Sequence, residues 1–176
     1  HRDIKPENIM IADGQEIKVL DFGIAKELSQ SKTKTGTGMG TVDYMAPEQY
    51  TDAKRVDQRA DVYALGMTLY EMLAGRLPWE AGSTEFHILT FKDQGDLPPP
   101  TDFYPHIPQT VVKEVFRATS RDIDTRHGSV QELMAALAAA NALAPADEKA
   151  SNVVDFGPSS NKAWESPRPV SNTEVS

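Results

Sequence analysis

The sequence predicts an α+β domain that is mainly α-helical, with one short β-hairpin near its beginning. Two short apolar segments, 9–12 and 16–20, flank Asp13-Gly14, which is a preferred hairpin turn. Farther along the chain, apolar residues recur at helical spacing in several segments separated by Gly and Pro. Together these two patterns favour a helical domain that carries a single hairpin.

A long loop and a long helix are predicted after the hairpin. Residues 22–45 are rich in Gly, Thr, Ser and Lys without apolar periodicity, and a loop of this length is usually functional or disordered. The helix is expected over 58–74, buried on most sides, with Gly75 as its C-cap and Pro78 blocking its continuation. Its apolar stripe consists of Val62, Leu65, Leu69, Met72 and Leu73, and is broadened by Tyr63, Met67 and Tyr70.

Three further helices are predicted. Two lie at 83–92 and 109–119, separated by the breaker run 98–100. Ser129 can cap the last one, with Glu132 completing a capping box before Leu133, Leu137 and Ala140. We expect the domain to span residues 1–142. Residues 143–176, rich in Ser, Asn, Pro and charge, are expected to form a disordered linker or tail.

Composition argues against several kinds of site and partner. The net charge of −8 argues against nucleic acid or an anionic membrane as a partner. The chain has no cysteine, which excludes disulfides, thiolate metal sites and a Cys nucleophile, and fits a cytoplasmic protein. No segment approaches the ~20 apolar residues that cross a bilayer, so no membrane segment is expected in this chain.

Three short motifs follow one another along the chain. They are His1-Arg2-Asp3-Ile4-Lys5-Pro6-Glu7-Asn8, Asp21-Phe22-Gly23 and Ala46-Pro47-Glu48. Alone, the second motif reads as a strand ending at a glycine turn, and the third as a helix start. The first constrains four residue types at set spacing, and all three in order indicate one mechanism.

The residue types in these motifs suit phosphoryl transfer, which needs a positioned hydroxyl, a positive charge and metal ligands. Asp3 can accept or orient the proton of a substrate hydroxyl, and Lys5 supplies a positive charge on the same side of an extended loop. Asn8 and Asp21 offer the oxygen ligands that Mg²⁺ prefers. The hairpin between them explains how two ligands distant in sequence could return to one place.

These motifs resemble those of the eukaryotic-like (Hanks-type) Ser/Thr protein kinases, over roughly residues 1–142. The wording Asp-Phe-Gly-Ile-Ala-Lys and Tyr-Met-Ala-Pro-Glu-Gln looks like the bacterial members. The resemblance implies the C-terminal lobe of a protein-kinase-like fold, ATP and Mg²⁺ as cofactors, and Ser/Thr hydroxyls of proteins as acceptors. Lys5 favours Ser/Thr over Tyr. The Gly-rich loop and nucleotide-clamping lysine of the N-terminal lobe do not occur in this chain, so we expect the fragment alone to be inactive.

The resemblance also assigns roles at the active centre. Asp3 would be the catalytic base, and Lys5 would contact the γ-phosphate. Asn8 and Asp21 would hold Mg²⁺, and Met10 would lie beneath the adenine. In addition, Thr41 would orient Asp3 and Lys5 and shape the substrate pocket.

Further implied roles are regulatory or structural. Arg2 would pair with a phosphate on the activation loop, for which Thr35 and Thr37 are the candidate acceptors, and two kinase copies could form a dimer for phosphorylation in trans. The implied structural roles fall on five residues. His1 and Phe22 would stack between the lobes, Asp61 would anchor the catalytic loop, and Glu48 would form a buried ion pair with Arg126.

Two other functions remain open. A pseudokinase would use the same fold as a binding module or scaffold, although such proteins typically lose at least one of Asp3, Lys5, Asn8 and Asp21. A small-molecule phosphotransferase would share the two aspartates but not the segment from Thr41 to Glu48. The protein could also be the cytosolic part of a membrane-anchored kinase.

Overall fold

The computed structural model describes residues 1–12, 16–20, 42–95 and 97–143. The described part begins with a short 3₁₀ turn, η1 (Pro6–Asn8), and an antiparallel hairpin of β1 (Ile9–Ala12) and β2 (Glu16–Val19). Ile9 pairs with Val19 and Ala12 with Glu16, which confirms the predicted hairpin. Its expected turn, Asp13-Gly14, lies outside the described residues, as does most of the predicted long loop.

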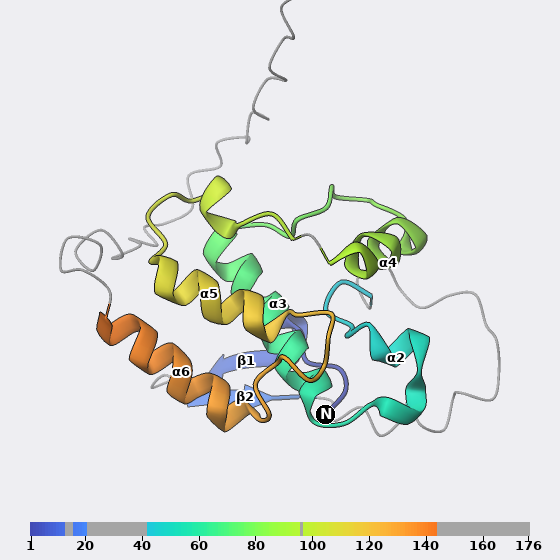
Figure 1. The fold of residues 1–176 in the computed structure, drawn as a ribbon, viewed down its shortest axis with the longest axis horizontal. Helices are drawn as coiled ribbons and strands as arrows, with labels where there is room; N and C mark the ends of the chain where they lie inside the picture. The colour runs from blue at the N-terminus through green and yellow to red at the C-terminus, as the bar shows by residue number, and fades with distance from the viewer. Residues whose placement is uncertain (13–15, 21–41, 96, 144–176) are drawn as a thin grey trace, which may run out of the picture.

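Helices make up most of the remaining chain. They are α2 (Glu48–Thr51), η2 (Ala53–Arg55), α3 (Arg59–Ala74), α4 (Glu85–Gln94), η3 (Pro100–Asp102), α5 (Gln109–Ala118) and α6 (Val130–Leu143). Figure 1 shows α3 crossing the middle of the molecule, with α5 and α6 on one side and α2 and α4 on the other. Helix α3 contacts α5, α6 and η3, so it is the element around which the others pack.

The predicted helices are confirmed, with small shifts at their ends. Gly75 ends α3 with φ of 71°, a left-handed conformation that glycine adopts without strain, and its amide donates to the Glu71 carbonyl at 2.8 Å. Helix α4 begins after Thr84, whose hydroxyl accepts from the His87 amide at 3.3 Å, and it extends to Gln94. The prediction for this helix was therefore about two residues too early at both ends.

The capping of α6 differs in one detail from the predicted box. The Ser129 hydroxyl accepts from the Glu132 amide at 3.1 Å, as expected of an N-cap. The Glu132 carboxylate, however, accepts from the Gly128 amide at 2.8 Å, one residue before the cap. The first turn of α6 is therefore stabilised both by the Ser129 side chain and by the Glu132 side chain.

The aliphatic stripe predicted for α3 is only partly buried, because Val62 is fully buried and its other members are not. Tyr63, Met67 and Tyr70 are fully buried, whereas Leu65 and Leu69 are half-buried and Met72 is 73% exposed. The larger core cluster gathers on the Tyr63 and Met67 face, together with residues of the 42–46 segment and α4. The expected burial of Met72 was wrong because periodicity identifies an apolar face but not which elements cover it.

Candidate active site

The first eight residues bring three predicted site residues together. The Asn8 side-chain amide donates to the Asp3 backbone carbonyl at 2.8 Å and to the Asp3 carboxylate at 3.2 Å. The Lys5 ammonium lies 3.9 Å from the same carboxylate oxygen, and both the Asp3 and Lys5 side chains are about one-fifth exposed. A carboxylate, a cation and a side-chain amide therefore meet within the first eight residues.

The hairpin returns the chain to this place. The Leu20 amide donates to the Asn8 carbonyl at 2.8 Å, and the His1 ring Nε2 lies 3.0 Å from the Leu20 carbonyl. Leu20 immediately precedes Asp21 in the sequence. Asp21 itself lies outside the described residues, as do Phe22, Thr35, Thr37 and Thr41.

Among the described residues, no group of three His, Cys, Asp or Glu side chains could hold a metal ion. Asn8 nevertheless carries an oxygen donor of the kind that Mg²⁺ prefers. Because the Asn8 Nδ2 donates to Asp3, the Asn8 amide oxygen is the atom that remains for a cation. A second oxygen ligand would have to come from Asp21, the residue after Leu20.

Helix α3 anchors the backbone directly before Asp3. The two Asp61 carboxylate oxygens accept from the backbone nitrogens of His1 and Arg2, each at 2.8 Å. Arg2 has φ of 65°, which is unfavourable for a residue with a Cβ and persists only where neighbouring contacts hold it. The hydrogen bonds to the Asp61 carboxylate stabilise this conformation in the residue directly before Asp3.

A second segment forms the opposite wall of a hollow beside Asp3 and Lys5. Tyr44, Met45 and Gln49 line this hollow. The Gln49 side chain accepts from the Ala46 amide at 2.9 Å and donates to the Arg2 carbonyl at 3.2 Å, so it joins the two walls. The Tyr44 hydroxyl donates to the Glu71 carboxylate at 2.5 Å. Burial and that carboxylate raise the pKa of Tyr44, which keeps the hydroxyl a donor.

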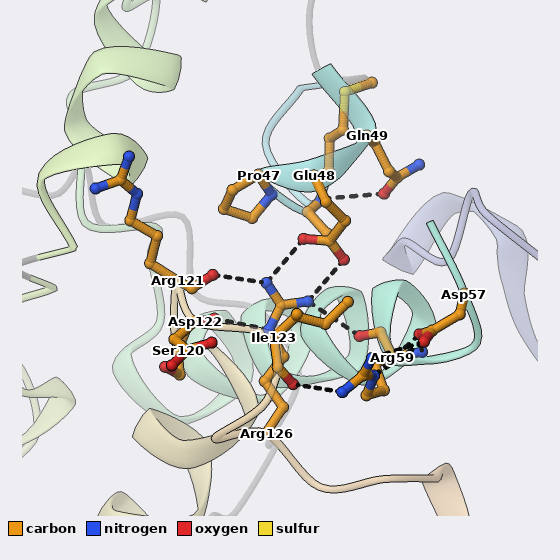
Figure 2. A network of polar contacts seen from close by, with 12 residues as sticks. Pro47, Glu48, Gln49, Asp57, Arg59, Ser120, Arg121, Asp122, Ile123 and Arg126 are labelled. Carbon is orange, nitrogen blue, oxygen red and sulfur yellow. Dashed lines mark hydrogen bonds and ion pairs between the residues drawn. The ribbon is translucent and has the colours of Figure 1, made fainter. Parts of the chain in front are cut away.

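A buried ion pair supports this wall (Figure 2). The Arg126 guanidinium donates to both oxygens of the Glu48 carboxylate, at 2.8 and 2.9 Å. The Arg126 side chain is fully buried, and its remaining donors reach the carbonyls of Ser120, Arg59 and Arg121. The ring of Tyr63 lies 4.8 Å from the guanidinium carbon. Glu48, at the start of α2, is thereby attached to the α5–α6 connection.

Comparison with known proteins places these motifs in a family. The profile of the protein kinase domain matches residues 1–139, most of the chain. The chain belongs to the protein kinase family. The match covers the hairpin, all the described helices up to α6, and the residues gathered around Asp3.

Individual bacterial kinases are similar over the same region. The chain is 38% identical to the probable serine/threonine-protein kinase PknB of Lactococcus lactis, over 81% of this chain and 23% of that protein. It is 38% identical to the serine/threonine-protein kinase PrkC of Bacillus subtilis, over 77% of this chain and 21% of that protein. The tyrosine-protein kinase MasK of Myxococcus xanthus is also 38% identical, over 78% of this chain and 21% of that protein. The chain thus spans between a fifth and a quarter of the length of these relatives.

The kinase chain contains site features that the sequence prediction missed. Lys92 is buried on α4, and the Tyr44 hydroxyl bonds to Glu71 across 27 residues. Lys92 lies four residues after Ile88, on one helix face among apolar neighbours, and this pattern was the available signal. Met10 is 49% exposed on the hairpin. None of the helices that the structure describes is long and apolar enough to span a bilayer.

Proposed function

We propose that the natural protein containing this chain is a Ser/Thr protein kinase that transfers the γ-phosphate of ATP to hydroxyls of protein substrates. The observation that carries the proposal is the grouping of Asp3, Lys5 and Asn8, of which Asp3 and Lys5 line a hollow. The other wall of this hollow is held by the bonds of Tyr44, Glu48 and Gln49 to other parts of the chain. The hollow is small, with a cavity volume of about 10 Å³, so it suits a single hydroxyl group directed at Asp3. The names of the bacterial Ser/Thr kinase relatives support the same activity.

The chain's own residues would act by position and charge. The Asp3 carboxylate would accept the hydroxyl proton as the hydroxyl oxygen bonds to the γ-phosphorus and the bond from that phosphorus to the ADP oxygen breaks. Lys5 would offset the negative charge on the transferred phosphoryl group. Asn8 and Asp21 would hold Mg²⁺, which neutralises phosphate charge when it is bound.

The Lys5 position supports Ser and Thr as acceptors over Tyr. One similar protein is named a tyrosine-protein kinase, so the test must also determine which hydroxyl amino acid accepts the phosphate. We also propose that this chain by itself does not transfer phosphate, because positioning of the nucleotide supplies more of the rate than a general base does.

The test is a γ-phosphate transfer assay with Mg-ATP on the full-length protein, meaning the natural protein that contains this chain. Ser, Thr and Tyr peptides are compared, and Asp3→Asn and the isolated chain serve as controls. We expect transfer to Ser or Thr that falls about 10²-fold or more in Asp3→Asn, and none from the isolated chain.

Other outcomes would assign another function. A folded full-length protein that binds ATP but transfers no phosphate would be a pseudokinase, acting as a binding module or scaffold. Transfer to small molecules but not to peptides would indicate a small-molecule phosphotransferase. Transfer to Tyr alone would contradict the assignment made from Lys5.

A further inference from the structure

One lysine is buried in the part of the fold that borders the active site. Lys92 lies on α4 and is only 2% exposed. Its ammonium donates to three backbone carbonyls: Val42 at 2.7 Å, Asp43 at 2.6 Å and Met45 at 2.9 Å. In its protonated form the Lys92 amine has three N–H donors, one for each carbonyl, and its neutral form keeps two.

The surroundings of this ammonium are otherwise apolar or aromatic. The rings of Tyr63 and Trp79 each lie 5.3 Å from Nζ. The Asp43 carboxylate accepts from the Trp79 indole nitrogen at 2.7 Å. Burial lowers the pKa of Lys92 to about 7, an effect that the Asp43 charge partly offsets. A buried ammonium is costly unless it is hydrogen-bonded, and an aliphatic side chain here would leave the three carbonyls without this donor.

Of the three residues that supply these carbonyls, Met45 lines the hollow beside Asp3, and Val42 and Asp43 precede it in the same segment. Tyr44 and Met45 line that hollow together with Asp3 and Lys5. Lys92 reaches the wall from behind, across 47 to 50 residues of sequence. Its bonds therefore fix the backbone of the segment that faces the catalytic carboxylate without touching the hollow itself.

We propose that Lys92 is a positioning residue that holds the 42–45 backbone in the conformation that receives the peptide substrate. The proposal rests on the proposed kinase function, and it identifies α4 as the element that sets peptide affinity. The proposal predicts different effects on the peptide and on ATP. Lys92 contacts the 42–45 segment and not Asn8, the proposed Mg²⁺ ligand, so its loss should affect the peptide and not the nucleotide.

The test compares a graded series of variants in the full-length protein. Lys92→Met removes all donors, Lys92→Gln keeps two N–H donors without charge, and Lys92→Arg keeps the charge. Lys113→Met, on an exposed position of α5, is the matched control. We expect Lys92→Met to raise the KM for peptide about tenfold or more, with the KM for ATP unchanged within about twofold. Lys92→Gln should be intermediate and Lys92→Arg closest to the natural protein.

A second measurement does not depend on catalysis. The Met45 amide donates to the Val42 carbonyl at 3.3 Å within the same segment. Hydrogen exchange of that amide should accelerate in Lys92→Met but not in Lys113→Met. If Lys92→Met fails to fold, Lys92→Gln takes its place in both measurements.

The two proposals fail in different ways. A natural protein without transfer activity would overturn the kinase proposal, while hydrogen exchange would still decide the role of Lys92. An active kinase whose peptide KM and Met45 exchange are unchanged in Lys92→Met would overturn the positioning role. Equal rises in the KM for peptide and for ATP would also overturn it, because they would indicate a general structural effect.

Discussion

All five hydrogen-bond donors of the Arg126 side chain have acceptors in the described part of the chain. Two of its donors reach Glu48, and the other three reach backbone carbonyls of residues 59, 120 and 121. A guanidinium is the only side chain with five donors in a rigid fork. The geometry therefore explains why arginine, and not merely a cation, occupies this position.

Replacing Arg126 with alanine should strongly destabilise the fold. The substitution leaves the Glu48 carboxylate buried without its partner, and we expect a loss of about 3–5 kcal/mol in the free energy of unfolding. Arg126→Lys keeps the charge but has only three donors, so it should lose less. Urea unfolding of the natural protein and both variants measures the difference. Equal stability of Arg126→Ala and the natural protein would contradict the buried pair.

At the scale of elements, α3 and α5 approach each other closely at Gly66. A Cβ at this position would lie 2.8 Å from the Thr119 methyl group and 2.9 Å from the Ala118 side chain. These distances are shorter than any ordinary carbon–carbon contact. Glycine is therefore needed in the middle of α3 even though it is a poor helix former.

Gly66→Ala should consequently destabilise the protein. Alanine gains about 1 kcal/mol in helix propensity, but overpacking typically costs about 1–3 kcal/mol, and contacts under 3 Å favour the upper part of that range. Thr119→Ser removes the nearer methyl group while keeping the hydroxyl that bonds to the Val115 carbonyl at 3.0 Å. The double variant should therefore recover part of the loss. Thermal unfolding of the single and double variants measures this coupling, and purely additive effects would contradict the close approach.

Across the whole molecule, α3 connects the parts of the site to one another. It anchors the catalytic segment through Asp61, the opposite wall through Glu71 and the buried arginine through Tyr63. Lys92 adds a connection from α4 to the same wall. A change in any of these contacts would act on the position of the two walls relative to each other.

Burial of Lys92 makes the stability of the whole fold depend on pH. Its pKa is lowered from 10.5 to about 7 in the folded protein, so between these values the unfolded chain binds one proton more. Stability should therefore rise with pH in this window, by up to about 1.4 kcal/mol per pH unit relative to Lys92→Met, which has no titrating group there. Urea unfolding of both proteins from pH 7 to about pH 10 tests this. A stability difference independent of pH would show that Lys92 keeps its proton.

The sequence by itself determined the fold class, the family and the local elements. The hairpin, the glycine end of α3 and the Ser129 cap all follow from residues close together in the chain, because turns and caps depend on local backbone geometry. The grouping of Asp3, Lys5 and Asn8 is also local, since eight residues contain it. Motif order then linked these residues to phosphoryl transfer.

Only the tertiary structure decided how far each side of α3 is buried and what lies behind the 42–45 segment. Met72 is exposed, and Lys92 bonds to carbonyls about fifty residues away. Backbone carbonyls have no sequence signature, so their use as acceptors for a distant ammonium cannot be inferred from residue types. The physical reason is that local pattern specifies which surfaces are apolar, whereas packing among distant segments selects which surfaces and which polar groups meet.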